Sequence, residues 1–254
     1  MAVLEDKQKD QLKELFGGLQ EIAKITLFKK EEECEFCDLT RELLEEVAGT
    51  SDKIELAIED FKPDSEAAKK YGVDKVPAIV IENNNDMGIR FYGVPAGYEF
   101  TPLVEDIIAV SMRQHGLEQQ VLDELEKIDQ PVHIQVLTSP TCPYCPVAVR
   151  TAHRLAMASD HIVADMIDSA EYPDLVEKYD VQGVPHTVIN ETQNFVGPVP
   201  ELELAYEILR ALGKPAPPRK VHDHDHEQDH AHEEGEVTEV DPEADKEQLE
   251  KEQE

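Results

Sequence analysis

The sequence predicts an α/β fold made of two tandem units, each a mixed central sheet flanked by helices. The first observation is a repeat: the pair Cys34–Cys37 recurs 108 residues later as Cys142–Cys145, and a Val-Pro dipeptide recurs at the same offset, at 76–77 and 184–185. The second observation is that the predicted elements follow both pairs in one order. A strand–helix–strand crossover joins parallel strands and a hairpin joins antiparallel ones, so each unit should hold a mixed sheet.

The first unit opens with a helix and a strand. Residues 6–19 carry leucine and phenylalanine at helical spacing, and residues 22–28 have the apolar and β-branched content of a strand. Cys34 should then open a helix that ends near Gly49, because its leucines and a valine fall on one face.

The remainder of the first unit predicts a strand, a short helix, a hairpin and a closing helix. Residues 54–58 alternate as a strand does, and Ser65 is a candidate N-cap for a helix over 66–71. Strands at 78–81 and 89–92 flank a long polar turn, and a helix over 103–112 has apolar residues on its inward face.

The second unit repeats this order after a linking helix over 117–128. The predicted elements are a strand at 132–137, a helix from Cys142, a strand at 162–167, a helix at 173–179, a strand at 186–189, a further strand, and a helix at 202–212. We place the two units at residues 1–116 and 117–213. Residues 214–254 are rich in His, Asp and Glu and nearly free of large apolar side chains, so they predict a disordered tail.

The chain is strongly acidic, with a net charge of −32. Residues 221–254 hold 15 acidic residues and two lysines, and their charge of −13 leaves −19 on the rest of the chain. Phosphate would be repelled, which disfavours nucleic acid and anionic membrane as partners. Two explanations stay open: adaptation to high salt, and an ordinary acidic soluble protein.

Cysteine use and the N-terminus indicate a cellular location. All four cysteines belong to the two pairs, so none remains to staple a secreted scaffold. Residues 1–7 lack a basic region followed by an apolar core, and no apolar run approaches the roughly 20 residues that span a bilayer. We therefore expect a cytoplasmic protein that does not enter membranes.

Each cysteine pair should lie at a turn from a strand into a helix. The unpaired N–H groups and the dipole of a helix N-terminus favour an anion there, in this case a thiolate. Such positions lower a thiol pKa from about 8.5 to roughly 3.5–7.5. We expect the leading cysteines, Cys34 and Cys142, to attack disulfides, and Cys37 and Cys145 to resolve the mixed disulfides that form.

Three segments add a family resemblance: Pro-Thr-Cys-Pro-Tyr-Cys-Pro at 140–146, the residues at 148–150 and 152–153, and Phe-Tyr-Gly-Val-Pro-Ala-Gly-Tyr-Glu-Phe at 91–100. Over about residues 8–213 the chain resembles the two-unit protein disulfide oxidoreductases of archaea and some thermophilic bacteria, also called glutaredoxin-like proteins. The resemblance implies two thioredoxin-like units whose redox centres are the disulfides Cys34–Cys37 and Cys142–Cys145, with no bound cofactor. It also implies protein substrates and a thioredoxin-reductase-like flavoprotein as reductant. Glu35, the acidic surface and the tail depart from the family pattern.

The resemblance further implies that the two repeated prolines are cis and lie beside the cysteines. A cis X–Pro bond costs only about 0.5–1 kcal/mol over trans. The dipeptides would then offer backbone groups to an extended substrate, which makes four residues candidate substrate-binding positions: Val76, Pro77, Val184 and Pro185. The alternative is a trans proline that interrupts a strand.

The two pairs should differ in reducing power. Glu35 lies inside the first pair and residues 31–33 are also glutamate, whereas the second pair encloses Pro143 and Tyr144. Negative charge destabilises a thiolate, and with it the reduced form. We therefore expect Cys34–Cys37 to be the more reducing couple and Cys142–Cys145 the principal, more oxidising one.

Other candidates are weaker. Asp60 and Asp168 end matching strands and would either assist proton transfer or cap a loop; His153 is expected to be packed or at the surface, and Phe36 and Tyr144 to shape the rim that substrates touch. The tail offers five histidines that would bind Zn, Ni or Cu weakly, or would simply be solvated: His222, His224, His226, His230 and His232.

These observations predict a protein thiol–disulfide oxidoreductase that reduces, oxidises or isomerises protein disulfides. Two alternatives remain. One is a redox-dependent chaperone or interaction module. The other is a zinc protein that uses all four cysteines, although 104 residues between Cys37 and Cys142 far exceed the spacing of a compact zinc ribbon.

Overall fold

The computed structural model describes residues 3–219 of the chain, so the histidines of the predicted tail and the question of metal binding there lie outside the described residues. The described part is one compact unit that extends to Pro217. The first residues of the predicted tail contact it: Lys214 Nζ lies 2.6 Å from Asp129 Oδ1, and Arg210 donates a hydrogen bond to the Pro217 carbonyl.

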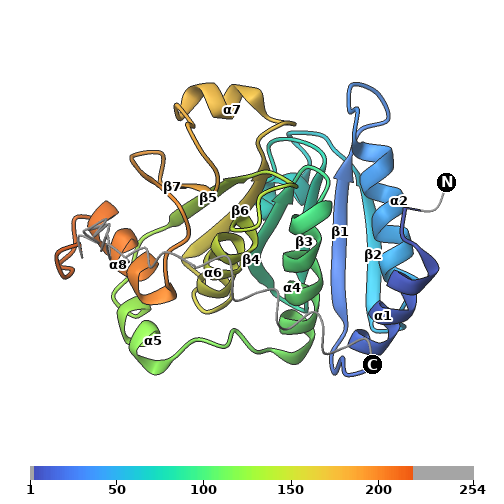
Figure 1. Ribbon diagram of the computed structural model, residues 1–254, viewed down its shortest axis with the longest axis horizontal. Coiled ribbons are helices and arrows are strands. Elements are labelled where there is room, and N and C mark those ends of the chain that lie inside the picture. Colours follow the sequence, from blue (N-terminus) through green and yellow to red (C-terminus); the bar gives the residue numbers. More distant parts are fainter. Residues whose placement is uncertain (1–2, 220–254) are drawn as a thin grey trace, which may run out of the picture. The chain divides into compact units, whose positions relative to one another are not determined.

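Eight strands form one continuous mixed sheet in the order β2-β1-β3-β4-β6-β5-β7-β8 (Figure 1). Each repeat contributes four strands, and the last strand of the first repeat pairs in parallel with a strand of the second. The two predicted sheets are therefore joined edge to edge. The strands are β1 (Ala23–Lys29), β2 (Ile54–Asp60), β3 (Ala78–Glu82), β4 (Asp86–Tyr92), β5 (Val132–Thr138), β6 (Ile162–Asp168), β7 (His186–Ile189) and β8 (Gln193–Val196).

Strand direction brings both cysteine pairs to one edge of this sheet. β1 is antiparallel to β3, and β3 is antiparallel to β4, so β1 and β4 point the same way. β4 is parallel to β6, and β6 to β5. The carboxyl ends of β1, β4, β6 and β5 therefore meet at one edge, which we call the cysteine edge. The loops after β4 and β6 lie on it between the two pairs.

Helices cover both faces of the sheet, as predicted. Buried side chains of α1, α2, α4, α5, α6 and α8 share one apolar cluster with the sheet, and those of α3 and α7 belong to a second cluster on the other face. The helices are α1 (Asp6–Phe16), α2 (Cys37–Ala48), α3 (Glu66–Tyr71), α4 (Phe100–Met112), α5 (Gln119–Leu125), α6 (Cys145–Met157), α7 (Pro173–Lys178) and α8 (Glu201–Ala211), with a 3₁₀ turn η1 (Gly97–Glu99) before α4.

Element boundaries differ from the prediction mainly at helix starts. α2 and α6 begin at the second cysteine of each pair, because Phe36 and Tyr144 occupy the cap positions. The prediction that the leading cysteines open these helices was wrong by one turn, and both lie in the preceding loop. The predicted cap is confirmed: the Ser65 hydroxyl accepts a hydrogen bond from the Ala68 amide at 3.2 Å.

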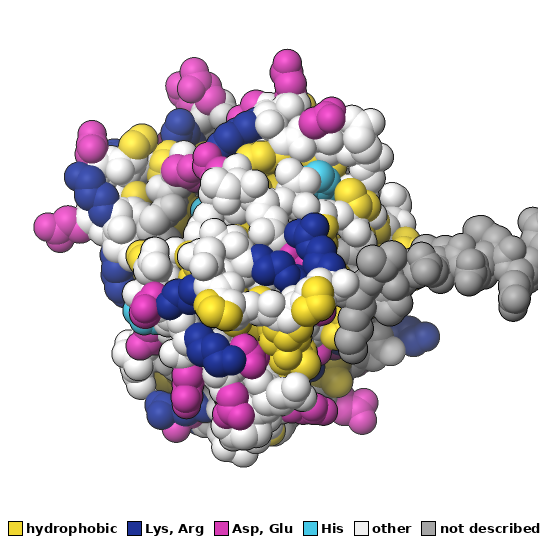
Figure 2. All heavy atoms as spheres, turned by 90° about the vertical axis from the view of Figure 1, so that its left-hand side faces the viewer, with side chains coloured by type: hydrophobic (Ala, Val, Ile, Leu, Met, Phe, Trp, Pro, Cys, Tyr) yellow, Lys and Arg dark blue, Asp and Glu magenta, His cyan; other side chains and the backbone are white. Residues whose placement is uncertain are grey.

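The described surface carries both acidic and basic side chains. Figure 2 shows a face on which acidic side chains project around the rim and basic side chains lie between them. Within residues 3–219, no helix combines the length and the apolar character that a membrane crossing requires.

Candidate active site

The second cysteine pair is a disulfide held at the start of α6. The Cα atoms of Cys142 and Cys145 lie 5.5 Å apart. The Cys145 amide donates a hydrogen bond to Cys142 Sγ at 3.2 Å, so this N–H group is in place to stabilise a thiolate. Cys145 is fully buried and Cys142 is 9 % exposed. The leading sulfur is therefore the more accessible, as predicted, but it is recessed rather than open.

Exposed apolar side chains occur on the segments next to the recessed sulfur. Tyr144 is 66 % exposed between the cysteines, and Val147 is 41 % exposed on the first turn of α6. Val196 precedes Gly197, whose amide donates a hydrogen bond to the Pro185 carbonyl. Tyr98 donates its amide to the Pro140 carbonyl just before the pair. Tyr144 and Val147 are thus exposed apolar side chains at the second pair, and the exposed Tyr98 and Val196 belong to loops that are hydrogen-bonded next to the pair and to its cis-proline. Contact of Tyr144 with substrates stays a prediction.

The first pair has the same local geometry and a different border. The Cα atoms of Cys34 and Cys37 lie 5.4 Å apart in a disulfide. Cys37 is buried, Cys34 and Phe36 are half-buried, and Glu35 is exposed. The glutamates at 31–33 are also exposed, so acidic side chains occupy the border that is apolar at the second pair.

Both repeated prolines are cis, as the resemblance implied. At the second pair, Cys142 Sγ lies 3.7 Å from the Val184 carbonyl oxygen. At the first, Phe28 of β1 pairs with Ala78, which follows Pro77, so this loop also lies at the cysteine edge. The substrate-binding roles of Val76, Pro77, Val184 and Pro185 stay predictions.

A fully buried carboxyl, Glu99, lies at the end of the strand that leads to the second pair. It accepts a short hydrogen bond from the hydroxyl of Thr138, the last residue of β5, and its Oε2 has no hydrogen-bond partner among the described residues. Burial raises the pKa of Glu99 to about 8. η1, which carries Glu99, contacts α6, which Cys145 opens. Sequence reasoning gave Glu99 no role, although it lies in the segment 91–100 that carries the resemblance.

Two further carboxyls lie between the pairs. Asp168 is buried at the end of β6, and the half-buried Glu171 accepts a hydrogen bond from the Val94 amide at 2.7 Å. Burial raises the pKa of Asp168, and it raises that of Glu171 to about 7. Asp168 caps its own loop, since it accepts a hydrogen bond from the Ala170 amide at 2.8 Å. Asp60 differs: its side chain is 63 % exposed and pairs with Lys62 at 3.2 Å.

His153 is packed rather than catalytic. It is fully buried on α6, its Nδ1 lies 2.6 Å from Asp106 Oδ2 on α4, and its ring lies edge-on to Phe91 at 4.9 Å. The packed environment predicted for this histidine is confirmed, and the pair joins helices of the two repeats.

The structure does not bring the four cysteines together. The strands β1 and β5 that lead to them are four strand spacings apart, about 19 Å at about 4.8 Å each. Within residues 3–219, no group of three or more His, Cys, Asp or Glu side chains is arranged to hold a metal ion. A single zinc held by Cys34, Cys37, Cys142 and Cys145 is therefore incompatible with this fold.

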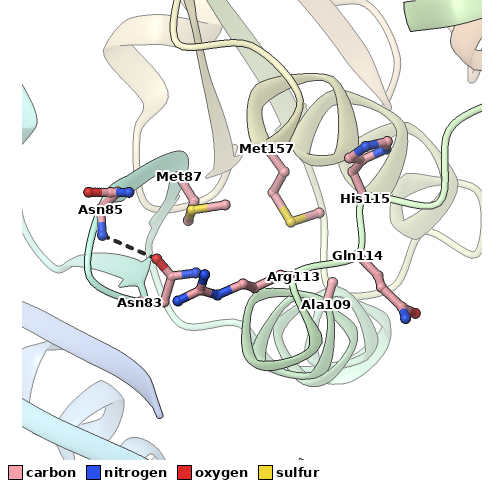
Figure 3. Close-up of a pocket in the computed structure, with 8 residues that line it drawn as sticks. All are labelled: Asn83, Asn85, Met87, Ala109, Arg113, Gln114, His115 and Met157. Carbon is pink, nitrogen blue, oxygen red and sulfur yellow. Dashed lines mark hydrogen bonds between the residues drawn. The ribbon is translucent and has the colours of Figure 1, made fainter. Parts of the chain in front are cut away.

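A separate cavity of about 200 Å³ lies at the opposite edge of the sheet (Figure 3). Asn83 and Asn85 line it from the turn after β3, which runs antiparallel to β1, and Arg113 and Met157 line it from the ends of α4 and α6. Because it lies away from the cysteine edge, it takes no part in this site.

A thioredoxin-domain family model matches residues 132–210, which hold the second pair. Among solved structures, a protein disulfide oxidoreductase from Aeropyrum pernix K1 superimposes with a TM-score of 0.77 at 27% identity, over 85% of this chain and 98% of that one. The alkylhydroperoxide reductase component AhpF of Enterococcus faecalis gives a TM-score of 0.75 at 25% identity, over 81% of this chain and 99% of that one.

Among curated relatives, a protein named NADH dehydrogenase from Bacillus subtilis is 31% identical over 149 residues, which are 58% of this chain and 27% of that protein. The chain spans about a quarter of the first curated relatives it matches. The fold is thus thioredoxin-like in both repeats, and the resemblance to two-unit disulfide oxidoreductases is confirmed.

Proposed function

We propose that this chain is a protein thiol–disulfide oxidoreductase with two redox centres, Cys34–Cys37 and Cys142–Cys145. The observation that carries the proposal is the second centre, where the sulfur of Cys142 lies 3.7 Å from the carbonyl of a Val–cis-Pro loop and the adjacent Tyr144 and Val147 are exposed. An extended polypeptide that pairs with the backbone of Val184 would bring its own sulfur to Cys142. Val76 and Pro77 would serve the first centre in the same way.

Reduction of a substrate proceeds in two exchanges. The Cys142 thiolate attacks one sulfur of the substrate disulfide, a mixed disulfide forms, and the other substrate sulfur leaves as a thiolate that takes a proton. Cys145 then loses its proton and attacks Cys142 Sγ, which releases the second substrate thiolate and leaves the Cys142–Cys145 disulfide. Two electrons pass from the pair to the substrate. Oxidation and isomerisation use the same steps in reverse or in part.

Glu99 is the group we assign to the proton of Cys145. It is buried, it is hydrogen-bonded to Thr138 at the end of β5, and its turn contacts α6, the helix that Cys145 begins. Burial raises its pKa to about 8. A carboxyl with a pKa near the working pH exchanges protons effectively with a thiol. In its charged form Glu99 would accept the Cys145 proton during resolution.

A flavoprotein that resembles thioredoxin reductase is the reductant we propose. The proposal is supported by the curated relative named NADH dehydrogenase. The segment that matches this chain is 27% of that protein, so there it belongs to a larger protein whose name states a reaction with NADH. The other reaction partners are proteins that carry disulfides or thiols. We further propose that the chain is divided into two units, residues 1–116 and 117–213. We also propose that the protein is cytoplasmic.

Reduction of insulin disulfides by dithiothreitol, with and without the protein, tests the function. The intact chain should accelerate the reaction, Cys142→Ser should remove most of the acceleration, and Cys34→Ser a smaller part. A chain in which all four cysteines are serine is the control. Suppression of aggregation by that control, without any acceleration by the intact chain, would favour a chaperone instead.

A further inference from the structure

Part of the first centre is built from the second repeat. The loop Asp168–Tyr172, which follows β6, reaches the loop that carries Pro77: the Tyr172 hydroxyl donates a hydrogen bond to the Pro77 carbonyl at 3.2 Å. Glu171 accepts the Val94 amide just after β4. Both cis-proline carbonyls also accept an amide from their own repeat, Pro77 that of Gly93 at 3.2 Å and Pro185 that of Gly197 at 2.8 Å. The Tyr172 hydroxyl is therefore an additional contact at the first centre, and it comes from the other repeat.

Close packing holds Glu171 in this position. Gly93 lies under it with φ +101°, and a Cβ there would be 2.9 Å from Asp168 Cβ and 2.9 Å from Glu171 Oε1. One carboxylate oxygen of Glu171 is committed to Val94, and the other is buried without a hydrogen-bond partner among the described residues. When Glu171 is ionised, no hydrogen-bond donor among the described residues stabilises the charge on this second oxygen.

Among the described residues, the charged groups that shift the pKa of Glu171 are acidic. Asp168 on its own loop and Glu35, inside the first cysteine pair, both raise the pKa of Glu171 after burial itself, and Glu171 in turn raises that of Glu99 on η1. The Tyr172 hydrogen bond to Pro77 brings this loop to the first centre, and the effect of Glu35 on the pKa of Glu171 is consistent with that placement. At the same offset in the first repeat Glu171 corresponds to Pro63, and Asp60, the counterpart of Asp168, is exposed and paired with Lys62.

We propose that Glu171 is a positioning residue for the Cys34–Cys37 centre: its carboxylate, supplied by the second repeat, disfavours the Cys34 thiolate and keeps this centre the more reducing of the two. The inference rests on the proposed function, since it assigns a determinant of reactivity to one of its two redox pairs. In this proposal each repeat supplies an acid to the other repeat's centre, the buried Glu99 to the second pair and the half-buried Glu171 to the first.

The test measures alkylation of reduced Cys34 by iodoacetamide in a Cys142→Ser/Cys145→Ser chain, followed by mass spectrometry of the Cys34 peptide. Glu171→Gln keeps an oxygen for the Val94 amide and removes the charge. It should lower the Cys34 thiol pKa, read from the pH dependence of the rate, by about half a unit. Where Glu171 is charged and the thiol is still mostly protonated, this raises the rate by up to about threefold. At pH 5.5, where Glu171 is already protonated, the two rates should agree. Glu177→Gln, at an exposed position of α7, is the matched control and should leave both rates unchanged.

A second measurement needs no substitution at Glu171. Coupling between two titrating groups is reciprocal, so reduction of the first pair to its thiolate should raise the pKa of Glu171. Carboxyl ¹³C NMR measures this pKa. Reduction of only the second pair should raise it less. A Cys34 rate unaffected by Glu171→Gln, or raised equally at pH 5.5 and at higher pH, overturns the inference. Insulin reduction distinguishes this inference from the proposed function. If the intact chain reduces insulin but the Cys34 rate does not respond to Glu171→Gln, only the inference fails. If the Cys34 rate responds as described but the intact chain does not reduce insulin, only the proposed function fails.

Discussion

The sulfur of Cys142 lies 3.7 Å from the carbonyl oxygen of Val184, across the mouth of the second redox centre. This places the predicted nucleophile directly beside the backbone that would receive an extended substrate. The second centre is also bordered by apolar side chains, and the first by glutamates, so the two centres of one fold should differ in measurable ways.

The reduction potentials of the two pairs should differ, with the Cys34–Cys37 pair lower by about 30 mV or more, since about 30 mV corresponds to 1.4 kcal/mol for two electrons. Acidic groups near the first pair disfavour its thiolate and therefore its reduced form. Equilibration with glutathione in each single-pair chain gives the two values. The gap should narrow in 1 M KCl, where the Debye length is about 3 Å.

Glu35→Gln should raise the potential of the first pair and leave that of the second unchanged. Glu126→Gln, at the exposed end of α5, is the control and should move neither. Potentials in the opposite order, or a gap that does not respond to either salt or Glu35, would contradict the electrostatic explanation.

Glu99→Gln should stabilise the fold, and increasingly so as pH rises. The folded pKa of Glu99 is about 8 and its ordinary value is 4.5, so the folded state binds the proton more tightly. The native carboxyl therefore costs stability progressively between about pH 4.5 and 8, and glutamine removes this cost. We expect little difference at pH 4.5 and a gain on the order of 2–3 kcal/mol at pH 7. Urea unfolding at several pH values measures it, and a pH-independent difference would be the contrary result.

The same substitution should slow turnover. Without a carboxylate to take the Cys145 proton, resolution of the mixed disulfide should be slower by about tenfold or more. Single-turnover reduction of a peptide disulfide resolves this step from the first attack, which Glu99→Gln should leave nearly unchanged. Equal slowing of both steps would point to a distorted site rather than a lost proton acceptor.

Gly93→Ala and Gly197→Ala compare the same position in the two repeats. Both glycines have positive φ, +101° and +93°, but a Cβ at Gly93 would lie 2.9 Å from Asp168 Cβ and Glu171 Oε1, whereas nothing lies within 4 Å at Gly197. Both substitutions carry backbone strain of about 1–3 kcal/mol. Gly93→Ala should cost about 1–3 kcal/mol more because the contact is overpacked. Urea unfolding of the two variants tests this, and equal losses would contradict the packing at Gly93.

Local patterns predicted much of this molecule because they report local structure. Both cysteine pairs and the Ser65 cap follow from a few adjacent residues, and the repeat predicted the shared order of elements. The cis state of the two prolines followed from the family resemblance. The joining of the two sheets through β4 and β6 did not follow, since a pairing between repeats leaves no short-range signal in the sequence.

Asp60 and Asp168 show why a repeat does not transfer environment. Both end matching strands, but β2 is the edge strand of the sheet, whereas β6 lies between β4 and β5. Asp60 is therefore exposed and Asp168 buried. Glu99 and Glu171 escaped notice for the same reason, because each acquires its role from contact with the other repeat.

Trapping of the mixed disulfide tests the central claim most directly. In Cys145→Ser the second pair cannot resolve, so incubation of the reduced protein with a disulfide-bonded substrate should give a covalent adduct. Mass spectrometry should map the adduct to Cys142, and Cys37→Ser should accumulate one at Cys34. A chain in which all four cysteines are replaced by serine should form no adduct. Absence of an adduct at both Cys142 and Cys34 would contradict thiol–disulfide exchange as the activity of this protein.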